Sequence, residues 1–199
     1  MNTATKSTSP NASINFAKWI NEGWDLVFAN FWEFIIISII YVVVILAASS
    51  TILLKFILGG PLTVGIYYVI FQKMRGNPMN IGDISKGFNF FIAAMLADIL
   101  ISFFVWVGFI FLIIPGIVLS ALYMFTFPLI LEKNLDFWEA METSRKVVQK
   151  NIFEFSVFMF LMYILLLIGF LLIGIGFLIA LPITFAATAA AYRDIFGLE

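Results

Sequence analysis

The sequence predicts an all-α polytopic membrane protein whose six transmembrane helices form three hairpins. The first observation is the composition: 63% of the 199 residues are apolar and 12% are charged, whereas soluble domains contain roughly 45–50% and about 25%. The second is that charged residues divide the apolar sequence into three blocks, 31–72, 89–131 and 152–192. Each block is long enough to cross a bilayer twice, because one helical crossing needs about 20 apolar residues.

The third observation is the distribution of the eleven Lys and Arg residues. Ten of them lie before, between or after the three blocks, and only Lys55 lies near a turn inside a block. Basic residues collect in the cytoplasmic loops of membrane proteins. We therefore expect both termini to be cytoplasmic and the three hairpin turns to lie on the opposite side of the membrane.

Composition also limits the functions that the chain can have. It contains no His and no Cys, which excludes thiolate nucleophiles, histidine bases and the zinc sites built on these ligands. We expect a protein that is not an enzyme and that has neither a metal site nor a cofactor. The net charge of −1 argues against nucleic acid as a partner, because nucleic acid requires a clustered basic surface.

The chain divides into a short tail and one membrane domain. Residues 1–12 are polar and rich in Ser, Thr and Asn, which predicts a disordered cytoplasmic tail. Residues 13–199 are expected to form a single domain with crossings at about 31–50, 56–73, 93–113, 116–131, 152–172 and 175–192. The sixth crossing is rich in alanine and is expected to pack centrally, because small side chains let helices approach closely in lipid.

Glycine and proline interrupt helices and so predict where the crossings turn or bend. The first outer turn has two candidates, Ser49–Thr51 and Gly59–Pro61, of which the second breaks a helix more decisively. The remaining predictions are a turn at Pro115–Gly116, another at Gly174–Gly176, and kinks at two prolines inside crossings four and six. The predicted helix breaks are therefore Gly60, Pro61, Pro115, Gly116, Pro128 and Pro182.

The three blocks resemble one another. They open at Asn30, Asn89 and Asn151, about 60 residues apart, and a short amphipathic stretch precedes each of them. Similarity at a fixed period is typical of internal repeats, yet apolar hairpins also resemble one another by composition alone. A threefold duplication and a coincidence of composition both remain open at this point.

The stretch before the first block predicts an interfacial helix capped by Ser13. Its apolar positions follow helical spacing of three and four, namely Phe16, Ile20, Trp24, Val27, Phe28 and Phe31. Trp19 and Trp24 suit the headgroup region, where amphipathic rings collect. The segment is expected to lie on the inner leaflet before the first crossing.

The stretch before the third block predicts a second amphipathic helix. Asp136 caps it with Glu139 three residues later, and Glu142 pairs with Lys146 at i,i+4. Its less polar face carries Phe137, Met141, Ser144 and Val148. One interpretation is a docking helix for a cytoplasmic partner, and the favoured one is a helix that anchors the hairpins. The candidate interfacial or docking residues are Trp24, Trp138, Glu139, Glu142, Arg145 and Lys146.

Asp98 is the one carboxylate clearly within an apolar run, AAMLADILISFF. A charge at membrane depth predicts a functional site, so Asp98 is the candidate intramembrane polar site. The alternative, which we favour slightly, is that Asp98 lies at the inner interface. The hydroxyl residues of the crossings are expected to make separate helix–helix hydrogen bonds; they are Ser102, Ser120, Thr126, Ser156, Thr184 and Thr188.

The chain also resembles a group of bacterial six-helix membrane proteins of unknown function. The resemblance rests on three segments: GGPLTVGIYYVIFQKMRGN (59–77), IIPGIVLSALYMFTFPLILEKNLDFWEAMETSRKV (113–147) and AYRDIFG (191–197). The group is similar to the membrane domain attached to some glycerophosphoryl diester phosphodiesterases. This implies the six-helix architecture and a bacterial inner-membrane location, and it maps no catalytic residue onto this chain.

Two functions follow as expectations. The first is a non-enzymatic membrane protein that organises lipid or holds a cytoplasmic partner at the membrane, supported by the interfacial segments and by a shortage of buried polar groups. The alternative is a channel or transporter for a small or amphipathic solute, acting alone or as a homo-oligomer. An intramembrane enzyme is the least favoured, because no carboxylate pair or Ser-Lys couple stands at convincing spacing.

Overall fold

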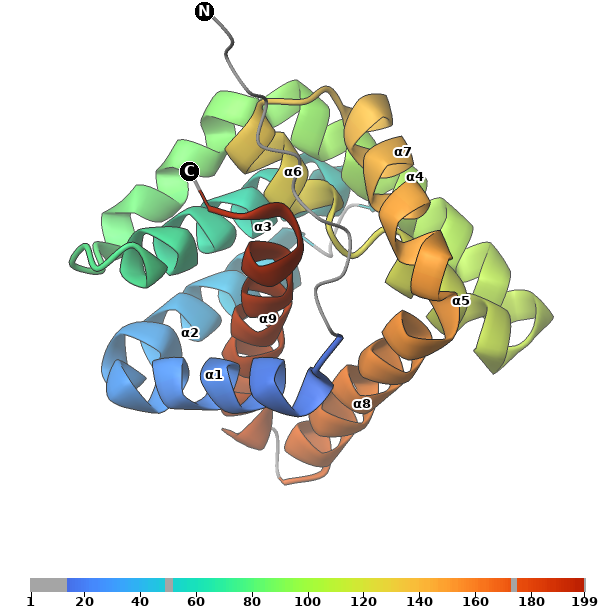
Figure 1. Cartoon of the computed structure of the whole chain (residues 1–199). Helices are drawn as coiled ribbons and strands as arrows, with labels where there is room; N and C mark the ends of the chain where they lie inside the picture. The colour runs from blue at the N-terminus through green and yellow to red at the C-terminus, as the bar shows by residue number, and fades with distance from the viewer. Residues whose placement is uncertain (1–13, 49–51, 173–174, 199) are drawn as a thin grey trace, which may run out of the picture.

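The computed structural model describes residues 14–48, 52–172 and 175–198 of the chain. These residues form helices and no strand (Figure 1). The predicted tail, residues 1–12, and the predicted turn residue Gly174 lie outside them. The helices are α1 (Phe16–Ala29), α2 (Phe31–Ala48), α3 (Ile52–Met74), the 3-10 helix η1 (Ile81–Phe90), α4 (Phe91–Phe111), α5 (Ile113–Leu122), α6 (Thr126–Lys133), α7 (Phe137–Val148), the 3-10 turn η2 (Gln149–Asn151), α8 (Ile152–Leu171) and α9 (Ile175–Phe196).

Six helical segments are long and apolar enough to cross a membrane, which confirms the predicted fold class. The protein is therefore a multi-pass integral membrane protein. The crossings are α2, α3, α4, α5 continued by α6, α8 and α9. Each hairpin joins two consecutive crossings, as the sequence predicts.

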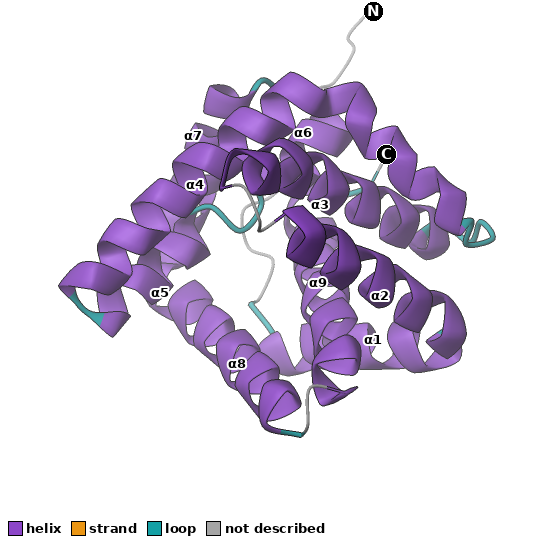
Figure 2. Cartoon of the chain, turned by 180° about the vertical axis from the view of Figure 1, so that it is seen from behind, coloured by secondary structure: helices purple, strands orange, loops and turns teal. Residues whose placement is uncertain are grey.

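The six crossings form a closed ring. Each packs on the next along the chain, and α2 packs on α9, so the last crossing meets the first. Figure 1 and Figure 2 show these helices surrounding the centre of the molecule from opposite sides. The returning crossings also pack on one another, because α3 contacts both α6 and α9.

The two crossings of each hairpin differ in burial. In the apolar windows of the first crossings, 22%, 11% and 22% of the residues are buried, whereas the returning crossings reach 67%, 50% and 61%. The first crossings instead expose large apolar side chains such as Val43, Phe103 and Phe170, which suits contact with lipid tails. In α9 the alanines at 186, 187, 189, 190 and 191 are buried completely, as predicted for this crossing.

The amphipathic segments repeat one packing relation three times. The helix α1 packs on α9, η1 packs on α3, and α7 packs on α6. Each segment that precedes a hairpin therefore contacts the returning crossing of the previous hairpin, and the relation closes on itself because α1 contacts the last crossing. The fold thus has a pseudo-threefold order that agrees with the similarity of the three sequence blocks.

The predicted break at Gly60 and Pro61 is wrong. Both residues lie inside the continuous helix α3. The helix α2 ends at Ala48, and the other candidate turn, Ser49–Thr51, lies outside the described residues. Proline is tolerated inside transmembrane helices because neighbouring helices support the freed backbone. Gly60 serves packing instead: a Cβ atom there would lie 2.1 Å from the carbonyl oxygen of Ala94 on α4.

The turn of the second hairpin lies earlier than predicted. The chain turns at the extended residue Leu112, whereas Pro115 and Gly116 lie in the first turn of α5. Proline is harmless there because the first amides of a helix have no partner within the helix. Gly116 packs against Gly108 of α4, where a Cβ atom would lie 2.9 Å from the Gly116 Cα atom.

The two prolines that were predicted to kink crossings four and six lie at different places in their helices. The fourth crossing is interrupted, but at residues 123–125; Pro128 follows the interruption, within the first turn of α6. Proline is tolerated at this position because the first amides of a helix have no partner within the helix. Pro182 lies inside α9, which continues to Phe196.

The helix α1 buries a different face from the predicted one. Asn15 caps it, accepting a hydrogen bond from the Lys18 amide at 2.9 Å, and Ser13 lies outside the described residues. Its buried residues are Trp19, Gly23 and Val27. Trp24 is 46% exposed, and the prediction that Trp19 also lies at the headgroups is wrong, because its ring is 1% exposed. The reason is protein contact: α1 packs on α9.

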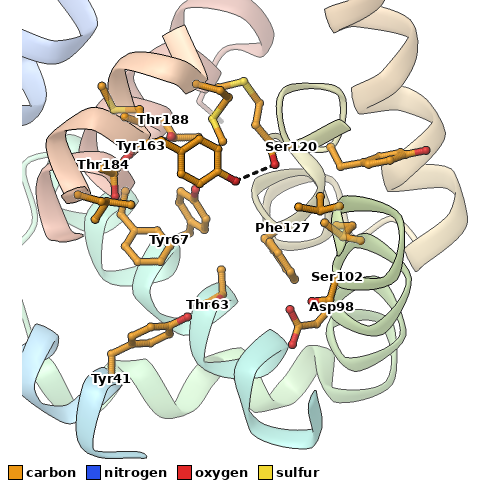
Figure 3. Close-up of a pocket in the computed structure, with 18 of the residues that line it drawn as sticks. Tyr41, Thr63, Tyr67, Asp98, Ser102, Ser120, Phe127, Tyr163, Thr184 and Thr188 are labelled. Atoms are coloured by element: carbon orange, nitrogen blue, oxygen red, sulfur yellow. Dashed lines mark hydrogen bonds between the residues drawn. The ribbon is translucent and has the colours of Figure 1, made fainter. Parts of the chain in front are cut away.

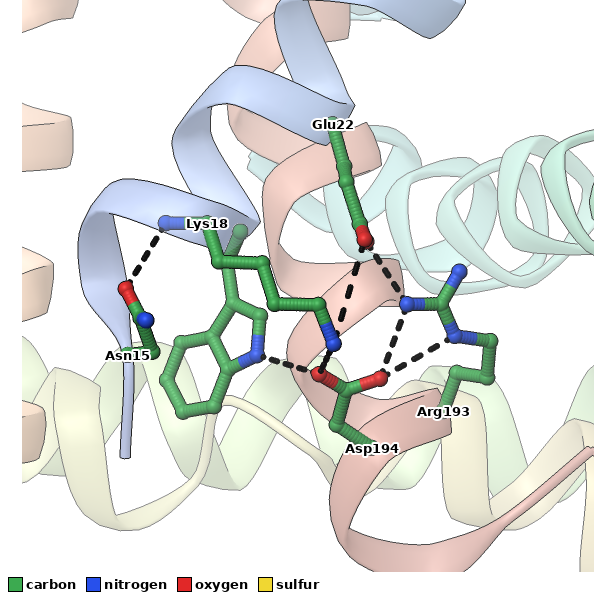
Figure 4. A network of polar contacts seen from close by, with 6 residues as sticks. Asn15, Lys18, Glu22, Arg193 and Asp194 are labelled. Carbon is green, nitrogen blue, oxygen red and sulfur yellow. Dashed lines mark hydrogen bonds and ion pairs between the residues drawn. The ribbon is translucent and has the colours of Figure 1, made fainter. Parts of the chain in front are cut away.

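A polar network fastens the beginning of α1 to the end of α9 (Figure 4). The Asp194 carboxylate accepts hydrogen bonds from Lys18 Nζ at 2.7 Å and from Trp19 Nε1 at 3.0 Å. The Arg193 guanidinium donates to Glu22 at 2.6 Å. The first and last described helices are thereby held side by side at one end of the molecule.

The charged ends of the three returning crossings meet at this same end. Arg75, after α3, forms an ion pair with Glu132 of α6, and the Lys133 ammonium lies 5.8 Å from the centre of the Phe196 ring at the end of α9. The charged ends of these crossings therefore converge at one end of the molecule, and the side of the membrane that they face stays a prediction.

Candidate functional site: a central cavity

A cavity of about 380 Å³ lies at the centre of the helix ring. All six crossings contribute to its lining. Its polar side chains are Tyr41, Thr63, Tyr67, Asp98, Ser102, Ser120, Tyr123, Tyr163, Thr184 and Thr188. Figure 3 labels these residues except Tyr123 and shows the labelled side chains converging from different helices. The expectation of scattered single hydroxyls is therefore wrong for Ser102, Ser120, Thr184 and Thr188, which share one cavity. The expected helix–helix hydrogen bond is present at Ser120, whose oxygen lies 2.7 Å from the Tyr163 hydroxyl of α8.

Helical spacing explains how single crossings supply pairs of these groups. Thr63 and Tyr67 on α3, Asp98 and Ser102 on α4, and Thr184 and Thr188 on α9 each stand four residues apart. Residues at i and i+4 lie on the same helix face, one turn apart. Three crossings thus present a polar strip to the cavity, and this repeated spacing is the sequence signal that could have predicted it.

Asp98 lies within α4 and lines the cavity. It therefore faces the interior of the helix ring, and its depth in the membrane stays a prediction. Gly59 of α3 makes room for the carboxylate: a Cβ atom at this glycine would lie 2.7 Å from Asp98 Oδ2. Lys55, one turn before Gly59, is exposed and acts on Asp98 electrostatically.

The cavity hydroxyls are supported by backbone carbonyls. Ser120 donates to Gly116 at 2.8 Å, and its oxygen lies 2.7 Å from the Tyr163 hydroxyl of α8. Thr188 donates to the carbonyl of Thr184 at 2.8 Å. Because these donors are used within the protein, the oxygens offer mainly acceptor lone pairs to anything in the cavity.

The interruption of the fourth crossing borders the cavity. Tyr123 and Met124 lie in it, and both line the cavity. Ser144 of α7 holds this geometry, because its hydroxyl donates to the carbonyl of Leu122 at 2.7 Å and accepts from the Phe125 amide at 3.2 Å. Hydrogen bonds from α7 therefore hold the interruption of the fourth crossing in place.

An aromatic cluster fills the space between the returning crossings at the charged end. Its members are buried and come from α3, from the interruption, from α8 and from α9: Phe71, Phe125, Phe155 and Tyr192. The ring of Phe125 lies 5.7 Å from Phe155 and 6.2 Å from Tyr192. None of these rings lines the cavity, so the cluster separates the cavity from the charged end.

The predicted docking residues are brought together only in part. Trp138, Glu142 and Arg145 of α7 line a separate hollow of about 280 Å³, which Tyr123 also borders. Glu139 and Lys146 are exposed on the same helix, and Trp24 lies on α1. The Asp136 cap is present, with its carboxylate accepting from the Glu139 amide at 2.8 Å.

The charges of α7 are engaged with one another. Arg145 donates to Glu142 at 2.7 and 2.8 Å, and Lys146 lies 3.5 Å from Glu142, the predicted pairing. The hydrogen bond from Arg145 lowers the pKa of Glu142 to about 2, so Glu142 is ionised at neutral pH. A partner would have to compete with these internal pairs.

In the described part of the chain, no group of three His, Cys, Asp or Glu residues is placed to hold a metal ion. The cavity has one carboxylate among hydroxyls, rings and thioethers. Such a lining can bind a solute.

These statements about the site rest on the geometry of the described residues and not on similarity to known proteins. Comparisons of the chain with models of protein families, with curated proteins and with solved structures found no match.

Proposed function

We propose that the protein is a membrane transporter that binds a small solute in the cavity at the centre of its helix ring. The main observation behind this proposal is that ten polar side chains, including Asp98, line one cavity of about 380 Å³ between all six crossings. Binding sites for small molecules are typically about 300–1,000 Å³, with a few convergent polar groups. Ionisable residues inside a membrane mark substrate pathways by default.

The interruption of the fourth crossing supports transport over a purely structural role. Transporters bind their substrates near discontinuous helices, where the unwound backbone is exposed to the site. Here Tyr123 and Met124 of the interruption line the cavity. The aromatic cluster at the charged end favours a carrier over an open channel, because access from that end requires the rings to move.

The scaffold function has weaker support than transport. It rests on a shortage of buried polar groups, and the cavity removes that argument. The charges of α7 on which docking depends are paired within the helix. Binding of a cytoplasmic protein, assembly into a homo-oligomer and the absence of enzymatic activity remain predictions, as do the resemblance to the bacterial six-helix group and the inner-membrane location.

Cysteine accessibility tests the transporter proposal directly, because the chain contains no Cys. Ser102→Cys places one thiol in the cavity, and the matched control Ser156→Cys places one on the exposed part of α8 that borders an apolar groove. Each variant is treated with a membrane-impermeant methanethiosulfonate, added in turn to either side of sealed vesicles.

We expect Ser102→Cys to react from both sides, because a carrier opens its cavity alternately, and Ser156→Cys to react slowly from either. Thiolates react only where water reaches them. A Ser102→Cys thiol that reacts from one side only, or from neither, contradicts transport.

A further inference from the structure

The cavity lining has one charged side chain. Asp98 is the only Asp, Glu, Lys or Arg among the residues that line it. Among the described residues none is found to hydrogen-bond its carboxylate, on which Lys55 acts only electrostatically. A charge at membrane depth is costly unless it is paired or reached by water. Water or a bound cation can then stabilise the charged carboxylate.

Aromatic rings surround the same space. Six helices each contribute one ring to the cavity lining: Tyr41, Tyr67, Trp106, Phe127, Tyr163 and Phe185. A cation within about 6 Å of a ring is attracted by the negative face of the ring, more strongly where water is excluded. The rings therefore add to the attraction of Asp98 for positive charge, and they repel anions.

The rest of the lining suits an organic group. The thioethers of Met124, Met159 and Met162 contribute flexible apolar surface, which adapts to irregular ligands. A divalent metal ion would require several oxygen ligands, and this cavity supplies a single carboxylate. Charge, rings and thioethers together match an ammonium group that carries carbon substituents.

From these observations, and resting on the transporter proposal above, we infer that the transported solute is an organic monocation, a protonated or quaternary amine whose ammonium group lies between Asp98 and the cavity rings. The hydroxyl oxygens accept hydrogen bonds from an N–H group or from a polar end of the solute. The apolar part of the solute contacts the methionines and Phe185.

Lys55 offers the competing explanation for Asp98. It acts on the carboxylate electrostatically from the outer part of α3. If Lys55 served as the counter-ion, the cavity would have little preference for cations. Its exposure and its position outside the cavity lining argue against this, and a Lys55→Gln variant separates the two explanations.

The test uses Ser102→Cys with two reagents of opposite charge. Ser102 stands one helical turn from Asp98 on the same face of α4. We expect the trimethylammonium-bearing methanethiosulfonate to react faster than the sulfonate-bearing one, relative to their rates with a free thiol. Adding Asp98→Asn should reduce this ratio about tenfold or more, because charges a few Å apart interact strongly in a low dielectric. Asp98→Glu and Lys55→Gln should preserve it.

A second measurement uses the native Asp98 and so does not depend on the folding of its variants. Choline should slow the labelling of Ser102→Cys by occupying the cavity, whereas its neutral carbon analogue 3,3-dimethylbutan-1-ol should not. Equal protection by the two probes, or a reagent ratio that Asp98→Asn leaves unchanged, would overturn the inference. A Ser102→Cys thiol that reacts with neither reagent would instead overturn the transporter proposal itself.

Discussion

The position of one carboxylate depends on a glycine that does not share its helix. Asp98 belongs to α4, and the space for its Oδ2 atom exists because Gly59 of α3 has no side chain. Trp19 likewise depends on a distant segment: its ring centre lies 6.2 Å from that of Phe155 on α8. At the residue scale, function and packing therefore depend on contacts between segments distant in sequence.

Gly59→Ala should destabilise the protein by about 1–3 kcal/mol, because the new methyl group overlaps the Asp98 carboxylate. In an Asp98→Ala background the same change should be neutral or should stabilise by up to about 1 kcal/mol, since alanine is the better helix former. Unfolding in detergent, followed by circular dichroism, measures all four proteins of this cycle. Equal effects of Gly59→Ala in both backgrounds would show that the two residues do not interact.

At the scale of elements, polar contacts between helices fix geometry that hydropathy does not describe. The interruption between α5 and α6 is held by Ser144 of α7, which satisfies one carbonyl and one amide freed by the break. Buried backbone groups are nearly always paired, so this serine determines where the fourth crossing can stop and resume.

Ser144→Ala should destabilise the protein by about 1–3 kcal/mol, because the carbonyl of Leu122 and the amide of Phe125 lose their buried partner. Ser156→Ala is the matched control, since its hydroxyl donates only to the carbonyl of Ile152 in its own helix at an exposed position. Thermal melting of the two variants in the same detergent compares them. A Ser144→Ala loss no larger than that of the control would mean that the break is held by other contacts.

On the scale of the whole molecule, α1 connects the beginning of the chain to its end. It packs on α9 through Gly23, where a Cβ atom would lie 2.7 Å from the Ala187 amide nitrogen, and Asp194 receives both Lys18 and Trp19. This contact completes the threefold order, in which each amphipathic segment packs on the returning crossing of the previous hairpin.

Asp194→Asn should loosen α1 without unfolding the ring, because it weakens the hydrogen bonds from Lys18 and Trp19 and leaves the crossings intact. We expect hydrogen exchange in residues 16–29 to quicken about tenfold, which corresponds to about 1.4 kcal/mol. Asp25→Asn, which changes an exposed carboxylate on α1 itself, should leave the exchange as it is. Faster exchange throughout α9 as well would instead indicate global unfolding.

Much of the fold was predictable from sequence because each feature depends on a short stretch of chain. A crossing requires about 20 apolar residues, and the three blocks meet this requirement twice each. The cap at Asp136 and the pair Glu142–Lys146 are local for the same reason. The breaks at Gly60–Pro61 and Pro115–Gly116 were misplaced because glycine and proline in a membrane helix also serve packing, and the partner that decides this is on another helix.

The sequence alone determined that the chain crosses a membrane six times in three hairpins, because the free energy of leaving water depends on composition summed along each segment. Tertiary structure alone decided that Asp98 and the hydroxyls meet. The cavity collects one to five residues from each crossing, between Tyr41 and Thr188. Each looks isolated in its own apolar run, and only the closing of the ring by α2 and α9 brings them within reach of one solute.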